Sequence, residues 1–507
     1  MSLFKAPLKG PPPAGLFSIR RSTHGPFSCW RSIPTPPGRR TFLAQALATA
    51  GLGTLAPVRT VAAESLVVGN ITGLYSVQVA RIETPRSTAE VSTLLKAWPG
   101  QVAVGGGRYS MGGQIAVEGG LHVDIRKLNQ LVWLRPAERA VRVQAGMRWR
   151  DLQDHLDPLG LAVKTMQSYS NFTVGGSVSV NVHGRYVGHG PLGHSVRALQ
   201  LVLADGSIVE ASRTAHGEFF RAAIGGYGAV AVITEVELDV AENVRIERVV
   251  QSVPLQGYVK HFKEKVLADP RAVLHNADLL PPTFDAPISV TWLRASDRQP
   301  LTESAKLVDR GRSYALEQNV IWSMTELPGG NRLRKTVIHP LLGDKPAVKW
   351  LNHEASLDVA ELEPRTRAMS TYVLQEYFIP EGHFLPFARA MAKVLQARDV
   401  EVLNVSIRHS PADRISMLPW AREDVFSFVL YYKQRTWRAA QESVGRWTRE
   451  LIELALRHEG RYYLPYQLHA TKSQFEATYP EVAQLRRVKQ QADPAGRLSN
   501  ELWRKYL

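Results

Sequence analysis

The chain has 507 residues, of which 44% are hydrophobic and 21% are charged. This is the composition of a soluble globular protein, and the length predicts two domains. The formal net charge is +16, but residues 1–63 hold eight Lys/Arg and no acid, so the remainder carries 54 − 46 = +8. That excess is scattered, without basic runs interleaved with aromatic residues, which argues against nucleic-acid binding.

The N-terminus has the pattern of an export signal. Residues 1–38 hold eight prolines and are predicted to be a disordered extension. Residues 39–63 begin with Arg39-Arg40, continue as an Ala/Gly-rich apolar run, and resemble a twin-arginine signal cleaved near Glu64. This predicts a periplasmic protein, while glycine and proline in the run argue against a stable membrane span. The alternative is a chance Arg-Arg pair ahead of a core helix.

The cysteine and histidine content limits the kinds of site that the chain can form. The single cysteine, Cys29, lies in the segment that we expect to be removed, so the mature chain would have no disulfide and no thiolate nucleophile. The histidines are dispersed, and His183, His189 and His194 share a loop without acids at ligand spacing. We therefore expect no metal site.

Residues 75–242 predict a self-contained α+β unit. Ser87 and Glu90 have the spacing of a helix N-terminus, and further helices are expected from Trp149 and near Phe219. Runs of apolar or alternating residues predict the strands Gln101–Val104, Leu121–Ile125, Ala140–Ala145, Val196–Leu203, Ile208–Ala211 and Ala231–Val240.

From about residue 246 the pattern changes to longer strands and helices. Val400–Ile407 and Phe426–Tyr432 read as strands, whereas Glu381–Ala397 and Thr436–Arg457 read as helices. We expect an antiparallel sheet with helices on one face. The basic, Gly- and Pro-rich residues 301–355 are either an insertion over a substrate entrance or a surface excursion.

Two glycine-rich stretches mark the candidate site. The first follows a predicted strand and runs through Val104, Gly105, Gly106, Gly107, Arg108, Tyr109, Ser110 and Gln114. The second, about 60 residues on, contains Thr173, Val174, Gly175, Gly176, Ser179, Asn181, His183 and Gly184. Exposed backbone amides in such turns suit a diphosphate. Two of them in one unit indicate a large dinucleotide, although the spacing does not fit the G-x-G-x-x-G pattern.

These motifs, in this order, resemble the vanillyl-alcohol-oxidase superfamily of FAD enzymes, also called the para-cresol-methylhydroxylase type. The resemblance continues through Gly193–Arg197, Ala204–Gly206, Gly225–Gly228 with Ile233, and Asp493–Arg497 with Asn500. It implies an FAD-binding domain at 70–245, a substrate or cap domain at 246–480, and a segment at 481–507 that returns to the first domain.

Within the superfamily the sequence is most similar to decaprenylphosphoryl-ribose oxidase and to the sugar-lactone and alditol oxidases. The resemblance implies that Gln375 and Lys472 face a substrate and that His469 contacts the flavin. Cytokinin dehydrogenases are also similar, but Ser168 stands where that family has its aspartate base, which argues against amine oxidation. Many relatives attach flavin to a histidine in the first loop, whereas Arg108 and Tyr109 stand there, so we expect non-covalent FAD.

The residues themselves suggest roles in an oxidation. Loop amides would hold the diphosphate, Arg108 would either neutralise phosphate or serve the fold, and Ser179, Asn181 and Ile233 are candidates for the ring and ribitol. Removing a hydroxyl proton needs a base, and His183, His469 and Lys472 titrate usefully. We favour Lys472 at the substrate and His183 beside the ring.

We therefore predict an FAD-dependent enzyme that oxidises a CH–OH group of a sugar, aldonolactone or polyol by hydride transfer to flavin N5. The alternatives are an NADPH-dependent reductase of the enolpyruvyl-sugar type, an amine-oxidising enzyme, and a non-enzymatic electron-relay protein. The sequence does not name the substrate or the electron acceptor.

Overall fold

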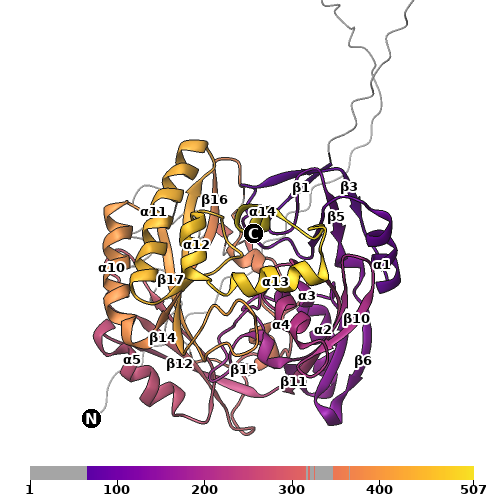
Figure 1. Ribbon diagram of the computed structural model, residues 1–507. Helices are drawn as coiled ribbons and strands as arrows, with labels where there is room; N and C mark the ends of the chain where they lie inside the picture. The colour runs from indigo at the N-terminus through magenta and orange to yellow at the C-terminus, as the bar shows by residue number, and fades with distance from the viewer. Residues whose placement is uncertain (1–65, 316–317, 320–324, 326–345, 365) are drawn as a thin grey trace, which may run out of the picture. The chain divides into compact units, whose positions relative to one another are not determined.

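The computed structural model describes residues 66–507, apart from 316–317, 320–324, 326–345 and 365. The described residues belong to one compact unit of mixed helix and strand, which confirms the predicted α+β class (Figure 1). The predicted extension and signal, and much of 301–355, lie outside the described residues. None of the described helices is long and apolar enough to cross a membrane.

The first half of the chain builds two larger sheets around one core (Figure 1). One is parallel, in the order β3-β5-β4; the other is antiparallel, in the order β10-β9-β11-β7-β6, with β8 paired to β11. The parallel strands are β3 (Arg81–Glu83), β4 (Val102–Gly105) and β5 (Leu121–Asp124). The antiparallel strands are β6 (Leu131–Arg135), β7 (Ala140–Gln144), β8 (Leu161–Val163), β9 (Val196–Val202), β10 (Ile208–Ser212) and β11 (Val232–Glu242). A separate ribbon joins β1 (Leu66–Gly69) to β2 (Ser76–Val79).

Four helices pack on these sheets: α1 (Thr88–Ala97), α2 (Trp149–Leu156), α3 (Val174–Ser179) and α4 (Gly217–Ala223). As predicted, Ser87 caps α1 by accepting a hydrogen bond from the Glu90 amide. The second glycine stretch differs from the expected loop, because its first residues form α3. The fully buried Trp149 explains this, since its indole Nε1 donates to Ser177 Oγ over 2.9 Å and so packs α2 against α3.

The second half forms one antiparallel sheet in the order β15-β12-β14-β13-β17-β18-β16-β19. Its strands are β12 (Arg245–Ser252), β13 (Ala272–Leu279), β14 (Ile288–Arg294), β15 (Val348–Trp350), β16 (Ser370–Pro380), β17 (Val402–Ser410), β18 (Val425–Arg435) and β19 (Arg461–Tyr462). Its helices are α5 (Tyr258–His261), α9 (Leu351–Ala355), α10 (Phe384–Ala397) and α11 (Arg438–Arg457). This confirms the predicted antiparallel sheet with flanking helices.

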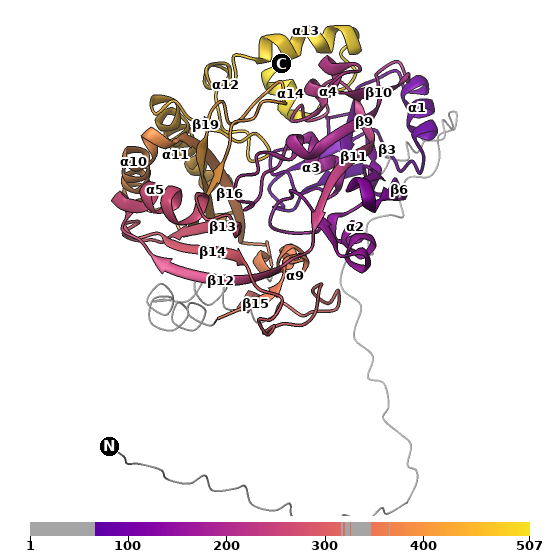
Figure 2. The same ribbon diagram turned by 90° about the horizontal axis from the view of Figure 1, so that it is seen from below.

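The two faces of this sheet have different neighbours. Helices α10 and α11 cover one face, where the ring of Tyr377 lies 6.0 Å from that of Phe387 and the ring of Tyr432 lies 4.9 Å from that of Trp447. In Figure 2, α10 and α11 lie on one side of β16, while α3 and β11 lie on the other. The face of the sheet opposite the helices therefore meets the glycine-rich stretches.

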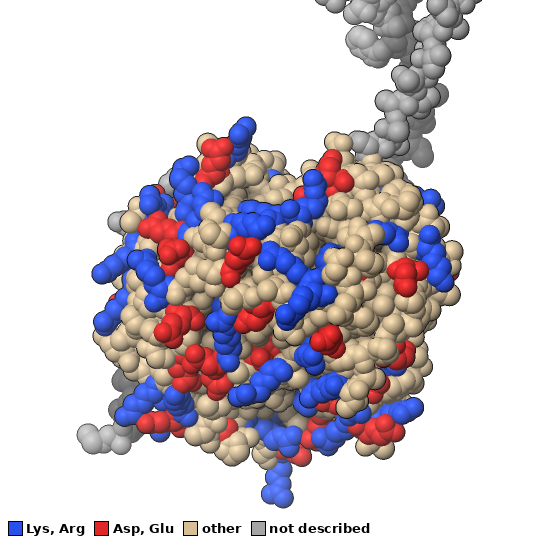
Figure 3. Space-filling model, in the orientation of Figure 1, with Lys and Arg blue, Asp and Glu red and all other residues tan. Residues whose placement is uncertain are grey.

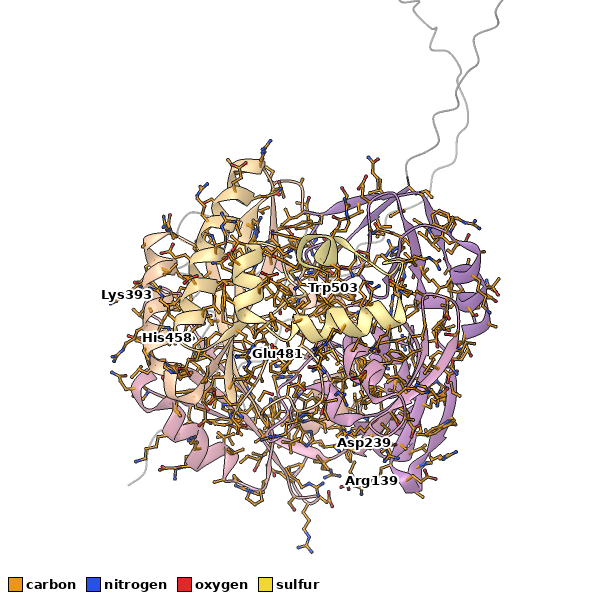
Figure 4. All side chains as sticks on the ribbon, in the orientation of Figure 1. Arg139, Asp239, Lys393, His458, Glu481 and Trp503 are labelled. Carbon is orange, nitrogen blue, oxygen red and sulfur yellow. The ribbon has the colours of Figure 1, made fainter. Side chains whose placement is uncertain are left out.

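The C-terminal segment contacts both halves of the molecule. It contains the helices α12 (Lys472–Thr478), α13 (Val482–Ala492) and α14 (Glu501–Tyr506). The Val102 amide on β4 donates to the Arg497 carbonyl over 2.7 Å, which places the segment before α14 beside the first glycine stretch. On α14, Trp503 Nε1 donates to the Gly226 carbonyl over 3.1 Å, and Glu481 before α13 accepts hydrogen bonds from Arg461 of the second sheet (Figure 4). These bonds hold the interface between the halves fixed.

Candidate functional site

The first glycine stretch leaves β4 with an arginine in a left-handed conformation. Arg108 has φ 64°, and its guanidinium lies 3.1 Å from the buried Asp124 carboxylate. The same carboxylate also accepts hydrogen bonds from Arg126. Arg108 is therefore already paired within the fold, which favours the structural role over phosphate neutralisation. Its Nε is buried and has no hydrogen-bond partner among the described residues.

The two glycine stretches lie side by side. A Cβ added at Gly106 would collide with the Thr173 hydroxyl, and one added at Gly107 would lie 3.7 Å from the Asn171 carbonyl. The Tyr109 ring stacks on Phe172 with 4.3 Å between centroids, and burial raises the pKa of Tyr109 to about 12. Glycine is thus required at Gly106 because the Thr173 side chain of the second stretch occupies the space that a Cβ would take.

The second stretch uses part of its backbone within the fold. The Val174 and Gly175 amides donate to the Met147 and Ala145 carbonyls, each over 2.8 Å. The sequence predicted that these amides would donate to the diphosphate, but the fold already uses both. A Cβ at Gly175 would lie 2.5 Å from that of Ala145, so this glycine serves packing on β7. By contrast, the buried hydroxyls of Thr173 and Ser168 have no partner among the described residues.

Three amide side chains that the sequence assigned to the cofactor are occupied by protein bonds. Asn181 donates to Asp413 and accepts from the Gly193 amide, both at 2.9 Å. Gln114 donates to the carbonyls of Leu464 and Tyr466 at 2.8 Å, and Asn500 donates to the Tyr227 carbonyl at 2.7 Å. These side chains hold distant segments against the loops, because a buried amide needs such partners.

Four further residues that the sequence assigned to the cofactor lie close to the two glycine stretches. The Ser179 carbonyl accepts the Tyr227 amide over 2.9 Å, and Ile233 is a buried residue of β11 paired with Leu201. Val104 lies in β4, and Ser110 is half-buried after the turn. The structure brings these residues close to the loops but shows no side-chain role for them.

A buried polar contact joins the two halves of the molecule. His183, which follows α3, lies with its Nε2 2.5 Å from Oε1 of Glu376 on β16, and both side chains are at most 5% exposed. The imidazole ring is enclosed by the aromatic rings of Trp420 at 4.9 Å and Phe378 at 5.5 Å. His183 Nδ1 is buried and has no partner among the described residues. His183, which the sequence predicted as a site residue, is therefore paired with the Glu376 carboxylate, which the sequence analysis did not predict.

Two further polar side chains surround this carboxylate. The Tyr466 hydroxyl donates to Glu376 Oε2 over 3.1 Å. Arg408, on β17, lies near enough to Glu376 to lower its pKa, and the Arg408 Nε is buried without a partner among the described residues. The cluster of His183, Glu376, Arg408 and Tyr466, which we call the interface cluster, thus combines a base, a cation and a hydroxyl at the meeting of both halves.

The electrostatics keep Glu376 ionised. Burial alone raises the pKa of a carboxyl, but His183, Arg408 and the Tyr466 hydrogen bond together hold the pKa of Glu376 below the usual 4.5. Burial and the neighbouring Glu376 raise the pKa of Tyr466, which therefore stays protonated as a donor. At neutral pH the cluster presents a carboxylate that can accept a proton.

The structure corrects the prediction for Gln375. Successive side chains of a strand point to opposite faces, and Glu376 meets His183, so Gln375 points to the face covered by α10 and α11. There it lies beside the Tyr432 hydroxyl, and its buried Nε2 has no hydrogen-bond partner among the described residues. Gln375 therefore points away from His183, and Glu376 is the residue of this strand that points toward the first half of the molecule.

The structure also separates Lys472 and His469 from the interface cluster. Lys472 is exposed as the first residue of α12, directly after the Thr471 cap. His469 lies against α11, where a Cβ at Gly445 would be 3.2 Å from its ring. The same segment instead contributes Tyr466, three residues before His469.

Replacing the exposed Lys472 with methionine tests this correction. We expect kcat/KM to change by less than about twofold, because substitutions of exposed side chains away from a site cost less than about 0.5 kcal/mol. Steady-state kinetics on the purified flavoprotein measure it. A tenfold or larger fall would return Lys472 to the site.

Comparisons with known proteins agree with this geometry. A family model described as an FAD binding domain matches residues 79–212, which include both glycine stretches. The chain is 23% identical to L-gulonolactone oxidase of Mus musculus, over 81% of this chain and 90% of that protein. It is 27% identical to alditol oxidase of a Streptomyces species, over 73% and 81%. It is also 31% identical to cytokinin dehydrogenase 2 of Arabidopsis thaliana, over 34% of each chain.

The residues at the two stretches fit FAD. Glycine at 106 and 107 lets this backbone lie directly against the Thr173 and Tyr109 side chains, and backbone without side chains is what a diphosphate cradle requires. The unpartnered buried groups Thr173 Oγ1, Ser168 Oγ and His183 Nδ1 would gain partners from a bound polar ligand. FAD is therefore the cofactor for which these positions are built.

Proposed function

Since the chain belongs to the vanillyl-alcohol-oxidase superfamily of FAD-binding oxidoreductases, we propose that it oxidises a CH–OH group of a sugar, aldonolactone or polyol. Relatives named for the oxidation of a gulonolactone and of alditols align along most of their length and support this substrate class. The observation that carries the proposal is the buried His183–Glu376 pair between the two halves.

Side chains of the interface cluster accept the proton that the substrate hydroxyl loses. Bound FAD supplies the hydride acceptor. The Glu376 carboxylate, ionised at neutral pH, receives the proton of the substrate hydroxyl, and its contact with His183 Nε2 stabilises the ionised form before that transfer. Tyr466 fixes the carboxylate through Oε2, and Arg408 provides positive charge beside a substrate oxygen. The surrounding aromatic rings exclude water from the pair.

Anaerobic reduction of the holoprotein tests the proposal. A panel of sugars, aldonolactones and polyols is added under argon, and bleaching of the flavin absorption bands is followed. We expect at least one member to bleach the flavin. Failure of the whole panel, together with rapid reduction by NADPH or by an amine, would reject this function in favour of a reductase or an amine oxidase.

We also propose that FAD is held without a covalent bond. Residues 105–110 contain no histidine, and Tyr109 is stacked on Phe172. Acid precipitation of the holoprotein should release the flavin into the supernatant.

We propose in addition that the protein is exported to the periplasm, which is supported by Arg39-Arg40 and the apolar run after it. Arg39→Lys with Arg40→Lys should retain the protein in the cytoplasm, as measured by cell fractionation. Unchanged export of this variant would contradict the proposal.

A further inference from the structure

A hollow lies on the opposite side of the second sheet from the interface cluster. It has a volume of 490 Å³ and follows one stripe of α11, formed by Arg438, Glu442, Gly445, Arg446 and Arg449, with His469 beside it. Helix α11 packs on the sheet through Trp447, whose ring contacts Tyr432. The helix and the sheet thus separate this hollow, which we call the α11 hollow, from His183 and Glu376.

The α11 hollow is strongly cationic. Three arginines line it and one glutamate opposes them, and that Glu442 is already paired with Arg438 at 2.9 Å. Arg449 donates to the His469 carbonyl over 3.3 Å, while Arg446 is exposed and makes no ion pair within the described part of the chain. On the face shown in Figure 3, Lys and Arg side chains lie over this region, interspersed with Asp and Glu. Two guanidinium groups therefore remain without a carboxylate.

The wall of the α11 hollow contains an unsatisfied donor or acceptor. Nε2 of His469 is buried and has no hydrogen-bond partner among the described residues. Gly445 keeps the space beside it open, since a Cβ there would lie 3.2 Å from His469 Nδ1 and 3.3 Å from an Arg449 guanidinium nitrogen. A buried polar atom of this kind is costly unless a ligand completes it.

Positively charged side chains close to His469 favour the binding of an anion in the α11 hollow. Burial, and then Lys505 and Arg449, lower the pKa of His469 to about 4. Burial and Arg449 also lower the pKa of Lys505. Cations on α11 and α14 therefore repel one another here, and a bound anion would relieve that repulsion.

We propose that the α11 hollow is a binding site for a phosphate group, carried either by a small soluble ester or by a lipid headgroup. Guanidinium groups bind phosphate oxygens through paired, charge-assisted hydrogen bonds, which Arg446 and Arg449 are placed to make. His469 Nδ1, which lies on the side of Gly445, adds a third polar contact. The volume accommodates a phosphate together with a small organic group.

Calorimetric titration of the full-length holoprotein with inorganic phosphate at neutral pH tests the site, and vesicles of phosphatidylglycerol form the second arm. The test variant is Arg446→Gln with Arg449→Gln. Arg457→Gln is the matched control, because Arg457 is an exposed arginine of the same helix outside the hollow. We expect the double variant to weaken binding by about tenfold or more and the control to leave it unchanged.

The outcomes separate the two sources. Binding of inorganic phosphate supports a soluble ester, and binding of vesicles alone supports a lipid headgroup. In the phosphate arm, a rise in the pKa of His469, followed by NMR of its ring protons, would locate the ligand. Absence of binding in both arms, or equal losses in the double variant and in Arg457→Gln, would overturn the proposal.

Discussion

Replacing Glu376 with glutamine is expected to lower kcat by about 10²- to 10⁴-fold, the usual contribution of a positioned general base. Glutamine keeps the size of the side chain and can still accept from Tyr466, but it cannot take the hydroxyl proton of a substrate. Because the glycine stretches are untouched, FAD content should match that of the unmodified protein. Stopped-flow flavin reduction by a substrate found in the panel measures the effect.

A matched control lies one residue away. Gln375→Met changes a buried side chain beside the Tyr432 hydroxyl on the helix-covered face, so it should alter thermal stability while leaving the rate of flavin reduction within about threefold. Equal losses of rate in both variants would contradict the assignment of Glu376 as the base and would indicate a general disturbance of β16.

The pH dependence follows from the direction of the pKa shift. The pKa of Glu376 is held below 4.5 in the fold, so the ionised carboxylate persists from neutral pH down to below that value. The stability that the ionised form contributes is present above 4.5 and is lost as pH falls through the lowered pKa. The acid limb of the unmodified enzyme should therefore lie below pH 4.5, and it should be missing from the residual activity of Glu376→Gln.

The neighbouring pair Gln375 and Glu376 shows what the sequence could not decide. Ten of the eleven residues of β16 are buried, because helices cover one face of the strand and the first half of the molecule covers the other. A strand buried on both faces loses the polar and apolar alternation that would assign its sides. The resemblance to known FAD enzymes pointed to this strand. Which of its two faces each side chain points to became clear only from the contact between Glu376 and His183.

The glycine stretches were predictable because clustered glycines after a strand are recognisable as a tight turn. The contact that makes Gly106 necessary, with the Thr173 side chain of the second stretch, was not visible from its neighbours in the sequence. Similarly, Asn181 and Gln114 bind partners 232 and 350 residues away in sequence, so nothing near them indicates that their amides are occupied. The same bonds from Gln114 hold the segment that presents Tyr466, which has no regular structure of its own.

Replacing Gly106 with alanine should abolish stable binding of FAD. The added Cβ collides with the buried Thr173 hydroxyl and would lie 3.3 Å from the Thr173 Cβ, so the two glycine stretches must separate at the cradle. We expect affinity for FAD to fall by at least about 100-fold, the size of effect that a displacement of about 1 Å produces at a positioned site. Fluorescence titration of the apoprotein with FAD measures this loss.

Two further variants decide whether the contact between the stretches is the cause. Gly257→Ala adds a methyl group where the structure has open space, and it should leave FAD affinity unchanged. Thr173→Ala alone removes the obstructing hydroxyl, and combined with Gly106→Ala it should restore part of the lost affinity, because the collision disappears while one polar partner of the ligand is also lost. Such a non-additive pair is the signature of direct coupling. If the double variant bound FAD no better than Gly106→Ala alone, the defect would lie in the conformation of the first stretch and not in its approach to the second.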